Sequence, residues 1–260
     1  MKELIELDFF DLGAAVALMV VAIGISAWEK LGLELNLALA TVRTILQLAV
    51  LGYVLDFIFA FDSNPVAVLA ILAVMLTIAA IVAKNRINQK MPQVVLFVWG
   101  SIFLSSALTI IYTNALIIQP SKWFEAQYVI PLASLVLGNA MNTAAIAGER
   151  LVKTINSSQM EIETHLSLGA TPQQAVAQYR KDSIRAALLP TINQMMIIGM
   201  VTVPGFFAGQ LLSGIDARNA ASYQIVIMFL IAFADLLTAV LLTRVLCNQF
   251  FNSAAQLVNK

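Results

Sequence analysis

Long apolar runs separated by short polar links dominate the chain. A helix needs about 20 predominantly apolar residues to cross the hydrocarbon core of a bilayer, and runs of this length recur along the sequence. The pattern therefore predicts an all-α membrane protein with about seven transmembrane helices. The predicted spans lie near residues 9–27, 36–58, 65–83, 94–113, 128–148, 191–212 and 222–246.

One long polar connection, about residues 149–190, interrupts this pattern between the fifth and sixth predicted spans. The other links are short, so most of the chain outside the membrane belongs to this connection. We expect residues 1–260 to form a single transmembrane domain, from which this segment, called the polar connection below, projects on one side.

Lysine and arginine residues indicate an orientation for these spans, because cytoplasmic loops of membrane proteins carry an excess of both. With the N-terminus outside and the C-terminus in the cytoplasm, 11 of the 15 positive residues are cytoplasmic, 3 are external and Arg43 is inside a span. The opposite orientation would reverse that bias. We therefore expect the polar connection to be cytoplasmic.

The composition agrees with the bilayer as the solvent of the chain. Hydrophobic residues make up 60% of the sequence and charged residues 12%, whereas a soluble domain carries about 25% charged residues. The net charge is zero and no long basic run occurs, which disfavours a nucleic-acid partner. Cys247 and His165 are the only residues of their types, which excludes an internal disulfide and a multi-histidine metal or haem site. The acidic start, MKELIELDFFDL, favours an uncleaved first span.

Glycine and proline punctuate the stretch ETHLSLGATPQQA within the polar connection. A helix that ends at Leu168 would be followed by Gly169 in the left-handed conformation common after helix ends. Thr171 can cap a second helix, with Pro172 in its first turn and Gln174 completing a capping box. We therefore predict two short helices joined by a fixed turn, although turn chemistry alone is equally compatible with an ordered loop.

The spacing of this stretch resembles the coupling loop of ABC transporter permeases. Glu163 precedes Gly169 by six residues, Ala-Thr-Pro follows, and Leu189-Pro190 stands where the next predicted span begins. In that family such a cytoplasmic helix docks into a groove on the ATPase subunit. Thr164 and His165 stand where two alanines are usual, which disfavours an importer permease. The resemblance assigns ATPase coupling to Glu161, Glu163, Leu168, Gly169, Ala170, Thr171 and Pro172.

Three longer runs resemble the FetB-like permeases. The runs are IPLASLVLGNAMNTAAIAGERL at 130–151, GMVTVPGFFAGQLLSG at 199–214 and YQIVIMFLIAFAD at 223–235. That family comprises seven-span membrane subunits of ABC exporters linked to iron efflux in bacteria, and its plant relatives are linked to aluminium tolerance. The resemblance implies a permease subunit in the bacterial inner membrane that works with a second copy of itself.

The energy source is expected on another chain. No G-x-x-x-x-G-K-[ST] motif occurs, and no soluble segment is large enough for a nucleotide-binding fold. The resemblance therefore implies a cytoplasmic ABC ATPase subunit that carries ATP and Mg²⁺. For this chain we expect no cofactor and no catalytic residue, with membrane lipid as its other partner.

Two charged residues fall inside predicted spans. Arg43 lies in the second span, with Gln47 one turn away on the same face, and Asp235 lies in the seventh. A charge at this depth costs at least about 2.5–3.5 kcal/mol, so each residue needs a partner or a wet cavity. The two could pair and hold the bundle together. Alternatively, Asp235 could serve a gate or a cation path.

A polar stripe in the fifth span and a helix breaker in the sixth are candidates for the translocation path. Asn139 and Asn142 share one helix face, and Glu149 lies further along the same helix. Their oxygens suit hard cations, although hydrogen bonding between helices explains the stripe equally well. Pro204-Gly205 should kink or break the sixth helix, as happens where backbone lines a cavity. The cluster of Met195, Met196 and Met200 suits either soft ions or ordinary packing.

These features favour an ABC exporter permease for iron or another metal cation. An organic or sugar-nucleotide cargo is the alternative within the same machinery. A membrane scaffold that binds a cytoplasmic protein through the polar connection, without transport, is the alternative from another class. An intramembrane enzyme is disfavoured because the sequence offers no constellation of His, Cys and Asp within the spans.

Overall fold

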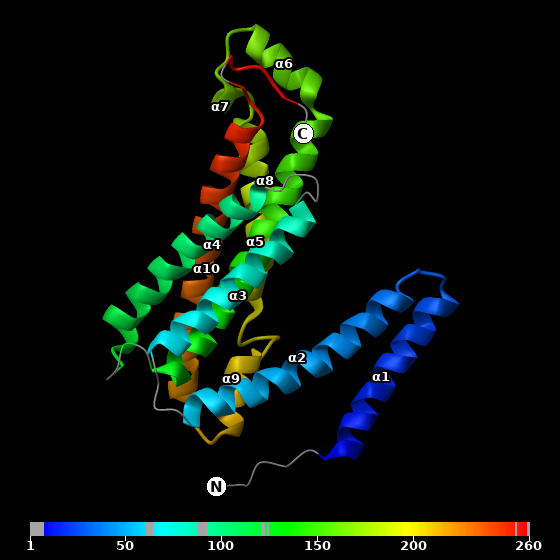
Figure 1. Ribbon diagram of the computed structural model, residues 1–260, viewed down its shortest axis with the longest axis vertical. Coiled ribbons are helices and arrows are strands. Elements are labelled where there is room, and N and C mark those ends of the chain that lie inside the picture. The colour runs from blue at the N-terminus through cyan, green and yellow to red at the C-terminus, as the bar shows by residue number, and fades with distance from the viewer. Residues whose placement is uncertain are drawn as a thin grey trace. The chain divides into compact units, whose positions relative to one another are not determined.

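The computed structural model describes residues 8–60, 65–87, 93–120, 123, 125–252 and 254–258. These residues are helical almost throughout, and the β-structure among them is confined to isolated bridges. Six helices in the described part of the chain are long and apolar enough to cross a membrane, which confirms an all-α membrane protein. They are α1 (Phe9–Trp28), α2 (Glu34–Ala60), α3 (Pro65–Ile87), α4 (Val94–Tyr112), α5 (Ala126–Ser157) and α10 (Ala217–Gln249), labelled in Figure 1.

The predicted sixth span, 191–212, is divided between two helices. The end of α8 (Ala177–Ile197) and the whole of α9 (Gly205–Leu212) flank an irregular stretch at 198–204, where Gly199 has φ +78°. The predicted break at Pro204-Gly205 is therefore confirmed, but the regular helix already ends at Ile197. The count of seven spans and their orientation stay predictions.

Contacts group the chain into two units, residues 1–64 with 212–214 and residues 65–211 with 215–260. In the first unit, α1 begins at a capping box formed by Asp8 and Asp11. Ser26 near the end of α1 donates a hydrogen bond to Glu34 Oε1 at the start of α2, over 3.0 Å. The single transmembrane domain expected from the sequence stays a prediction.

Helices α5 and α10 form the centre of the second unit (Figure 1). They pack against each other, and both pack against α4 and α8, while α3 packs against α5. Small side chains such as Ala140, Ala144 and Ala234 are fully buried here, which lets the helix backbones approach closely. At Gly148, an added Cβ would lie 2.5 Å from Ile87 Cδ1 of α3, so the Ile87 side chain packs directly on the α5 backbone.

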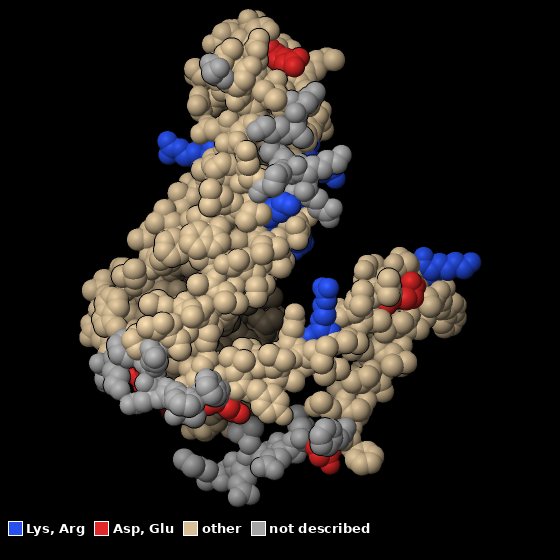
Figure 2. Space-filling model, viewed as in Figure 1, with Lys and Arg blue, Asp and Glu red and all other residues tan. Residues whose placement is uncertain are grey.

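The outer surface of the spans is apolar, as lipid contact requires. Leu69, Leu96 and Phe229 are 65%, 71% and 62% exposed. On the face drawn in Figure 2, charged side chains are few among the uncharged residues. Soluble monomers rarely expose apolar patches of this extent, so the surface agrees with burial in a bilayer.

Candidate coupling surface and buried polar sites

The polar connection contains the predicted pair of short helices. After α5 ends, α6 (Gln159–Ser167) is followed by Gly169 with φ +91°, in the left-handed region. The backbone N–H of Gly169 donates to Leu166 O and that of Ala170 to His165 O, each over 3.0 Å. This pair of hydrogen bonds satisfies the last carbonyl groups of α6 and fixes the direction of the chain. The predicted glycine turn is confirmed.

The second short helix, α7 (Pro172–Ala175), begins at the predicted capping box. Thr171 Oγ1 accepts a hydrogen bond from the Gln174 N–H over 3.3 Å, and Gln174 Oε1 accepts one from the Thr171 N–H over 2.8 Å. Pro172 occupies the first helical turn, where its missing N–H costs nothing. We call residues 159–175 the α6–α7 knob.

The knob is anchored in the core of the second unit. Ile162 is fully buried, Ala175 is 7% exposed, and both belong to one apolar cluster with Leu246 and Phe250 at the end of α10. The last described residues, which follow α10, lie beside α6 and α7 in Figure 1. The knob is therefore part of the packed structure, not a loop that hangs from it.

A polar contact fixes α6 to α8 as well. The Tyr179 hydroxyl of α8 interacts with Glu161 and with Ser158 beside the start of α6. Burial raises the pKa of Tyr179 above its ordinary value of 10.0, and the Glu161 carboxylate raises it further because it favours the protonated phenol. Glu161, a predicted coupling residue, thus has a positioning contact within the chain.

The outer face of the knob exposes two large apolar side chains. Met160 and Leu168 are 83% and 81% exposed, and Glu163 and Gly169 are exposed between and beside them. Such side chains can serve as anchors where another protein docks on a rigid surface. The structure thus places the predicted coupling residues on two short helices and the turn between them, and their role in coupling stays a prediction.

A second candidate site surrounds Asp235, which is fully buried in the middle of α10. The hydroxyl of Thr191 on α8 donates to Asp235 Oδ2 over 2.5 Å, and the Thr143 hydroxyl of α5 interacts with the same carboxylate. Asp235 Oδ1 has no hydrogen-bond partner among the described residues. Three helices therefore meet at one buried acid.

Arg43 lies on the exposed surface of α2, where it lines a hollow with Asn36 and Gln47. The predicted polar face formed by Arg43 and Gln47 is therefore present. Arg43 belongs to the first unit and Asp235 to the second, and their pairing stays a prediction.

The polar residues of the α5 stripe differ in burial and in hydrogen bonding. Asn139 is half-buried, and its amide donates to the Leu135 carbonyl of its own helix over 2.8 Å. Asn142 and Glu149 are exposed on the same helix. The stripe is therefore partly satisfied within α5, and its role in translocation stays a prediction.

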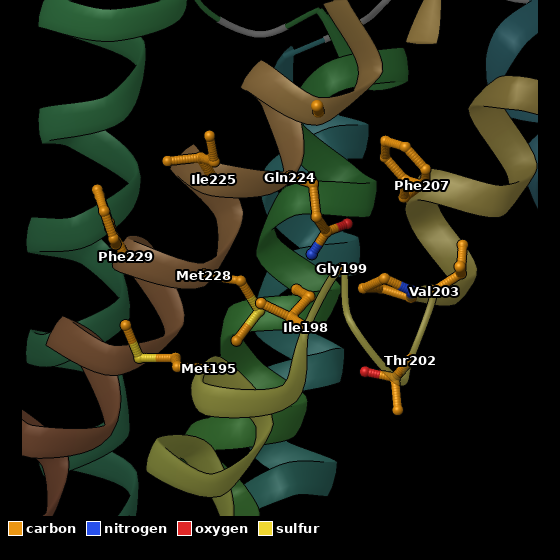
Figure 3. Close-up of a pocket in the computed structure, with 12 residues that line it drawn as sticks. Met195, Ile198, Gly199, Thr202, Val203, Phe207, Gln224, Ile225, Met228 and Phe229 are labelled. Atoms are coloured by element: carbon orange, nitrogen blue, oxygen red, sulfur yellow. The ribbon is translucent and has the colours of Figure 1, made fainter. Parts of the chain in front are cut away.

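A cavity of about 420 Å³ lies between the 198–204 stretch and α10 (Figure 3). Of the predicted path residues, Pro204 lines it, whereas Asn139 and Asn142 are not among its lining residues. Met195 of the predicted methionine cluster and Met228 of α10 contribute thioethers. Its polar lining residues are Thr202 and Gln224, neither of which was singled out from the sequence.

Helix α4 carries a polar ladder that the sequence analysis missed. Its buried residues Ser101, Ser105 and Thr109 recur every four positions, so they share one face of the helix, and buried Thr113 continues the spacing in the π-helical turn Thr113–Ile118 that follows α4. Ser105 Oγ and Thr238 Oγ1 of α10 are hydrogen-bonded over 2.6 Å. The regular spacing was the available signal, and it predicts a helix face that bonds to a neighbouring span.

Among the residues that the structure describes, no group of three or more His, Cys, Asp or Glu side chains could hold a metal ion. The buried polar groups in this described part of the chain are hydroxyls, amides and the single carboxylate of Asp235. Together with the spans, they define a multi-pass α-helical membrane protein that encloses polar groups among its helices.

The comparisons with known proteins give the family. Residues 9–251 match the profile described as "Uncharacterised protein family (UPF0014)", and the chain belongs to this family. A UPF0014 membrane protein from Synechocystis is 49% identical to it, over 98% of both chains. No solved structure matches the chain.

Two further relatives carry more specific names. FetB of Escherichia coli, named a probable iron export permease protein, is 36% identical over 95% of this chain and 94% of its own. STAR2 of Oryza sativa, named a UPF0014 membrane protein, is 33% identical over 94% of this chain and 84% of its own. The resemblance to FetB-like permeases found in the sequence is confirmed.

Proposed function

We propose that this chain is the membrane-spanning permease subunit of an ABC transporter, which exports iron or another metal cation with energy from a separate ATPase subunit. The observation that carries the proposal is the α6–α7 knob, a fixed helical projection with exposed apolar side chains. The cargo is suggested by the relationship to FetB, named a probable iron export permease protein. ATP and Mg²⁺ would bind to the partner ATPase, and this chain would perform no catalysis.

The knob suits a docking role because its shape is set before any partner arrives. The Gly169 turn, the Thr171 cap and the buried Ile162 each restrict its conformation. A surface that is already ordered loses little conformational entropy on binding, so more of the contact energy appears as affinity. Leu168 and Met160 would supply the apolar anchors.

The assembly follows from the same proposal. The excess of lysine and arginine favours a cytoplasmic position for the polar connection, and with it the knob, on the side where an ATPase would dock. A second copy of the chain would complete the transporter in the bacterial inner membrane. The cation path would use Asp235, the Asn139 and Asn142 stripe and the break at Pro204-Gly205.

The docking role can be tested by charge substitutions on the exposed face of the knob. Leu168→Asp and Glu163→Lys should abolish co-purification of the ATPase, because both residues are exposed and their replacement leaves the core intact. Asn248→Asp is the matched control, since it adds a negative charge at an exposed position of α10 outside the knob. The circular dichroism of all three variants should equal that of the unsubstituted permease.

Recovery of a normal complex with both knob variants would contradict the docking role. If the complex forms as expected, reconstituted vesicles then test the cargo. Iron salts should stimulate ATP hydrolysis. Iron ions should then accumulate on the side of the membrane away from the ATPase. Stimulation by organic compounds in place of metal salts would favour the organic cargo, and a stable complex without any stimulation would favour the scaffold.

A further inference from the structure

The cavity between the 198–204 stretch and α10 has a chemistry that metal export does not explain. We propose that this cavity binds an uncharged amphipathic organic molecule. The apolar body of this molecule fills the space, and its polar group donates a hydrogen bond to Gln224 Oε1 or Thr202 Oγ1. The site goes beyond the proposed function, because neither the ATPase nor a metal cargo is needed to form it.

The size and lining of the cavity suit a small organic ligand. Its volume of about 420 Å³ lies within the range of about 300–1,000 Å³ typical of such sites. Its apolar walls come from two directions, the stretch around the helix break and one face of α10. The apolar side chains that line it and would contact such a ligand include Met195, Ile198, Val203, Phe207, Ile225 and Met228.

Two polar groups in the lining lack partners. Gln224 is 7% exposed, and its Oε1 has no hydrogen-bond partner in the part of the chain that the structure describes. The same holds for the buried Oγ1 of Thr202. In Figure 3 the Gln224 side chain extends from α10 toward the 198–204 stretch. A buried acceptor without a donor costs about 1–3 kcal/mol, which a donor on a bound molecule would recover.

The backbone holds this arrangement in place. Ile198 and Thr202 form a β-bridge, and the Gly199 N–H donates to the Thr202 carbonyl over 2.9 Å. Gly199 reaches the required conformation with φ +78°, which residues with a Cβ rarely adopt. Thr202 is thus positioned by a closed turn, so the acceptor pair does not depend on a flexible loop.

This cavity offers no binding site for a bare metal cation, although Pro204 in its wall also flanks the proposed cation path. None of the described residues that line it is charged. An ion transferred from water into such an environment without a counter-charge pays a large desolvation cost, and two thioethers with one amide oxygen offset little of it. The lining therefore selects a molecule that carries no net charge.

Photolabelling of the purified permease in lipid nanodiscs tests the site without the ATPase. The probes are a long-chain primary alcohol with a diazirine in its chain and the matching hydrocarbon without the hydroxyl. Labelled peptides are located by mass spectrometry. The alcohol should label residues 195–229 about fivefold more than the hydrocarbon, as expected for one additional hydrogen bond, and excess unlabelled alcohol should suppress this labelling.

Two substitutions distinguish the contribution of the Gln224 hydrogen bond from that of the cavity volume. Gln224→Leu should reduce the preference for the alcohol toward equal labelling by both probes. Gln210→Leu is the matched control, because Gln210 of α9 has the same unpartnered Oε1 but does not line the cavity. Ala221→Trp, which fills the cavity from α10, should abolish labelling by both probes.

Equal labelling by the two probes in the unsubstituted protein would overturn the proposal. Labelling that excess alcohol does not suppress would do the same, because it would show that lipid chains fill the space without selection. The competition experiment requires no variant, so it decides the matter even if Ala221→Trp does not fold. Since no metal or nucleotide enters the experiment, its result is separate from that of the docking and transport tests.

Discussion

The hydrogen bond between Thr191 and Asp235 should contribute more to stability than any bond between two uncharged side chains in the bundle. Thr191→Val removes the donor while keeping the shape of the side chain, and it leaves Asp235 Oδ2 without the hydroxyl 2.5 Å away. Thr238→Val is the matched substitution, because Thr238 is also buried on a central helix and is bonded over 2.6 Å to the uncharged hydroxyl of Ser105.

The expected magnitudes differ by more than the error of an unfolding experiment. A hydrogen bond to a charged group contributes about 1.5–3 kcal/mol. Hydrogen bonds between transmembrane helices average about 0.6 kcal/mol. We therefore expect Thr191→Val to lower the free energy of unfolding by about 2 kcal/mol and Thr238→Val by about 0.6 kcal/mol.

The assay is reversible unfolding in mixed micelles with an increasing fraction of denaturing detergent, followed by circular dichroism. Thr191→Ser, which retains the hydroxyl, should be more stable than Thr191→Val. Addition of Asp235→Asn to Thr191→Val should reduce the cost of the first substitution, because the unpaired group is then neutral. Equal costs for Thr191→Val and Thr238→Val would refute the reasoning, since the carboxylate would then add nothing to the bond.

Three further predictions concern other parts of the fold. If Arg43 pairs with Asp235, Arg43→Gln should lower the free energy of unfolding by about 3–5 kcal/mol. A double-mutant cycle with Asp235→Asn should then show coupling between the two residues, whereas additive costs of the two single substitutions would rule out the pair. Gly148→Ala should cost about 1–3 kcal/mol in thermal unfolding because its Cβ meets the Ile87 side chain, and Ile87→Ala should recover part of that loss. A Gly148→Ala variant as stable as the parent would show that the Ile87 side chain can shift out of the way. Asn142→Leu should reduce metal transport in vesicles while leaving ATPase binding unchanged, and full transport would show that the stripe serves only the helix.

The spans could be predicted from the sequence because the bilayer imposes a length on any helix that crosses it. The sixth predicted span shows the limit of that argument. The residues around 198–204 are as apolar as a helix would require, so their hydropathy does not reveal that the backbone turns there. Pro204 indicated a break, but the left-handed Gly199 that begins it carries no such signal in a run of apolar residues.

The α6–α7 knob could be predicted because its determinants are close in sequence. Gly169, Thr171 and Gln174 act on their own neighbours, and the observed hydrogen bonds span three to five residues. The surroundings of Asp235 could not be predicted in this way. Its partner Thr191 lies 44 residues away, and only the packing of α8 on α10 brings the two together. The same holds for Gln224 and Thr202 at the cavity.

Helix α10 runs without interruption past the knob, the buried Asp235 and the cavity. Leu246 and the adjoining Phe250 pack against the knob at one end, Asp235 lies in the middle, and Gln224 lines the cavity toward the other end. The rise of an α-helix puts Gln224 about 39 Å from Phe250, so a tilt of only about 5° at the knob would shift the cavity wall by roughly 3 Å. Leverage of this kind needs no chain of side-chain rearrangements. A force applied to the knob would reach the buried acid and the cavity at the same moment, with an amplitude that grows with distance along the helix.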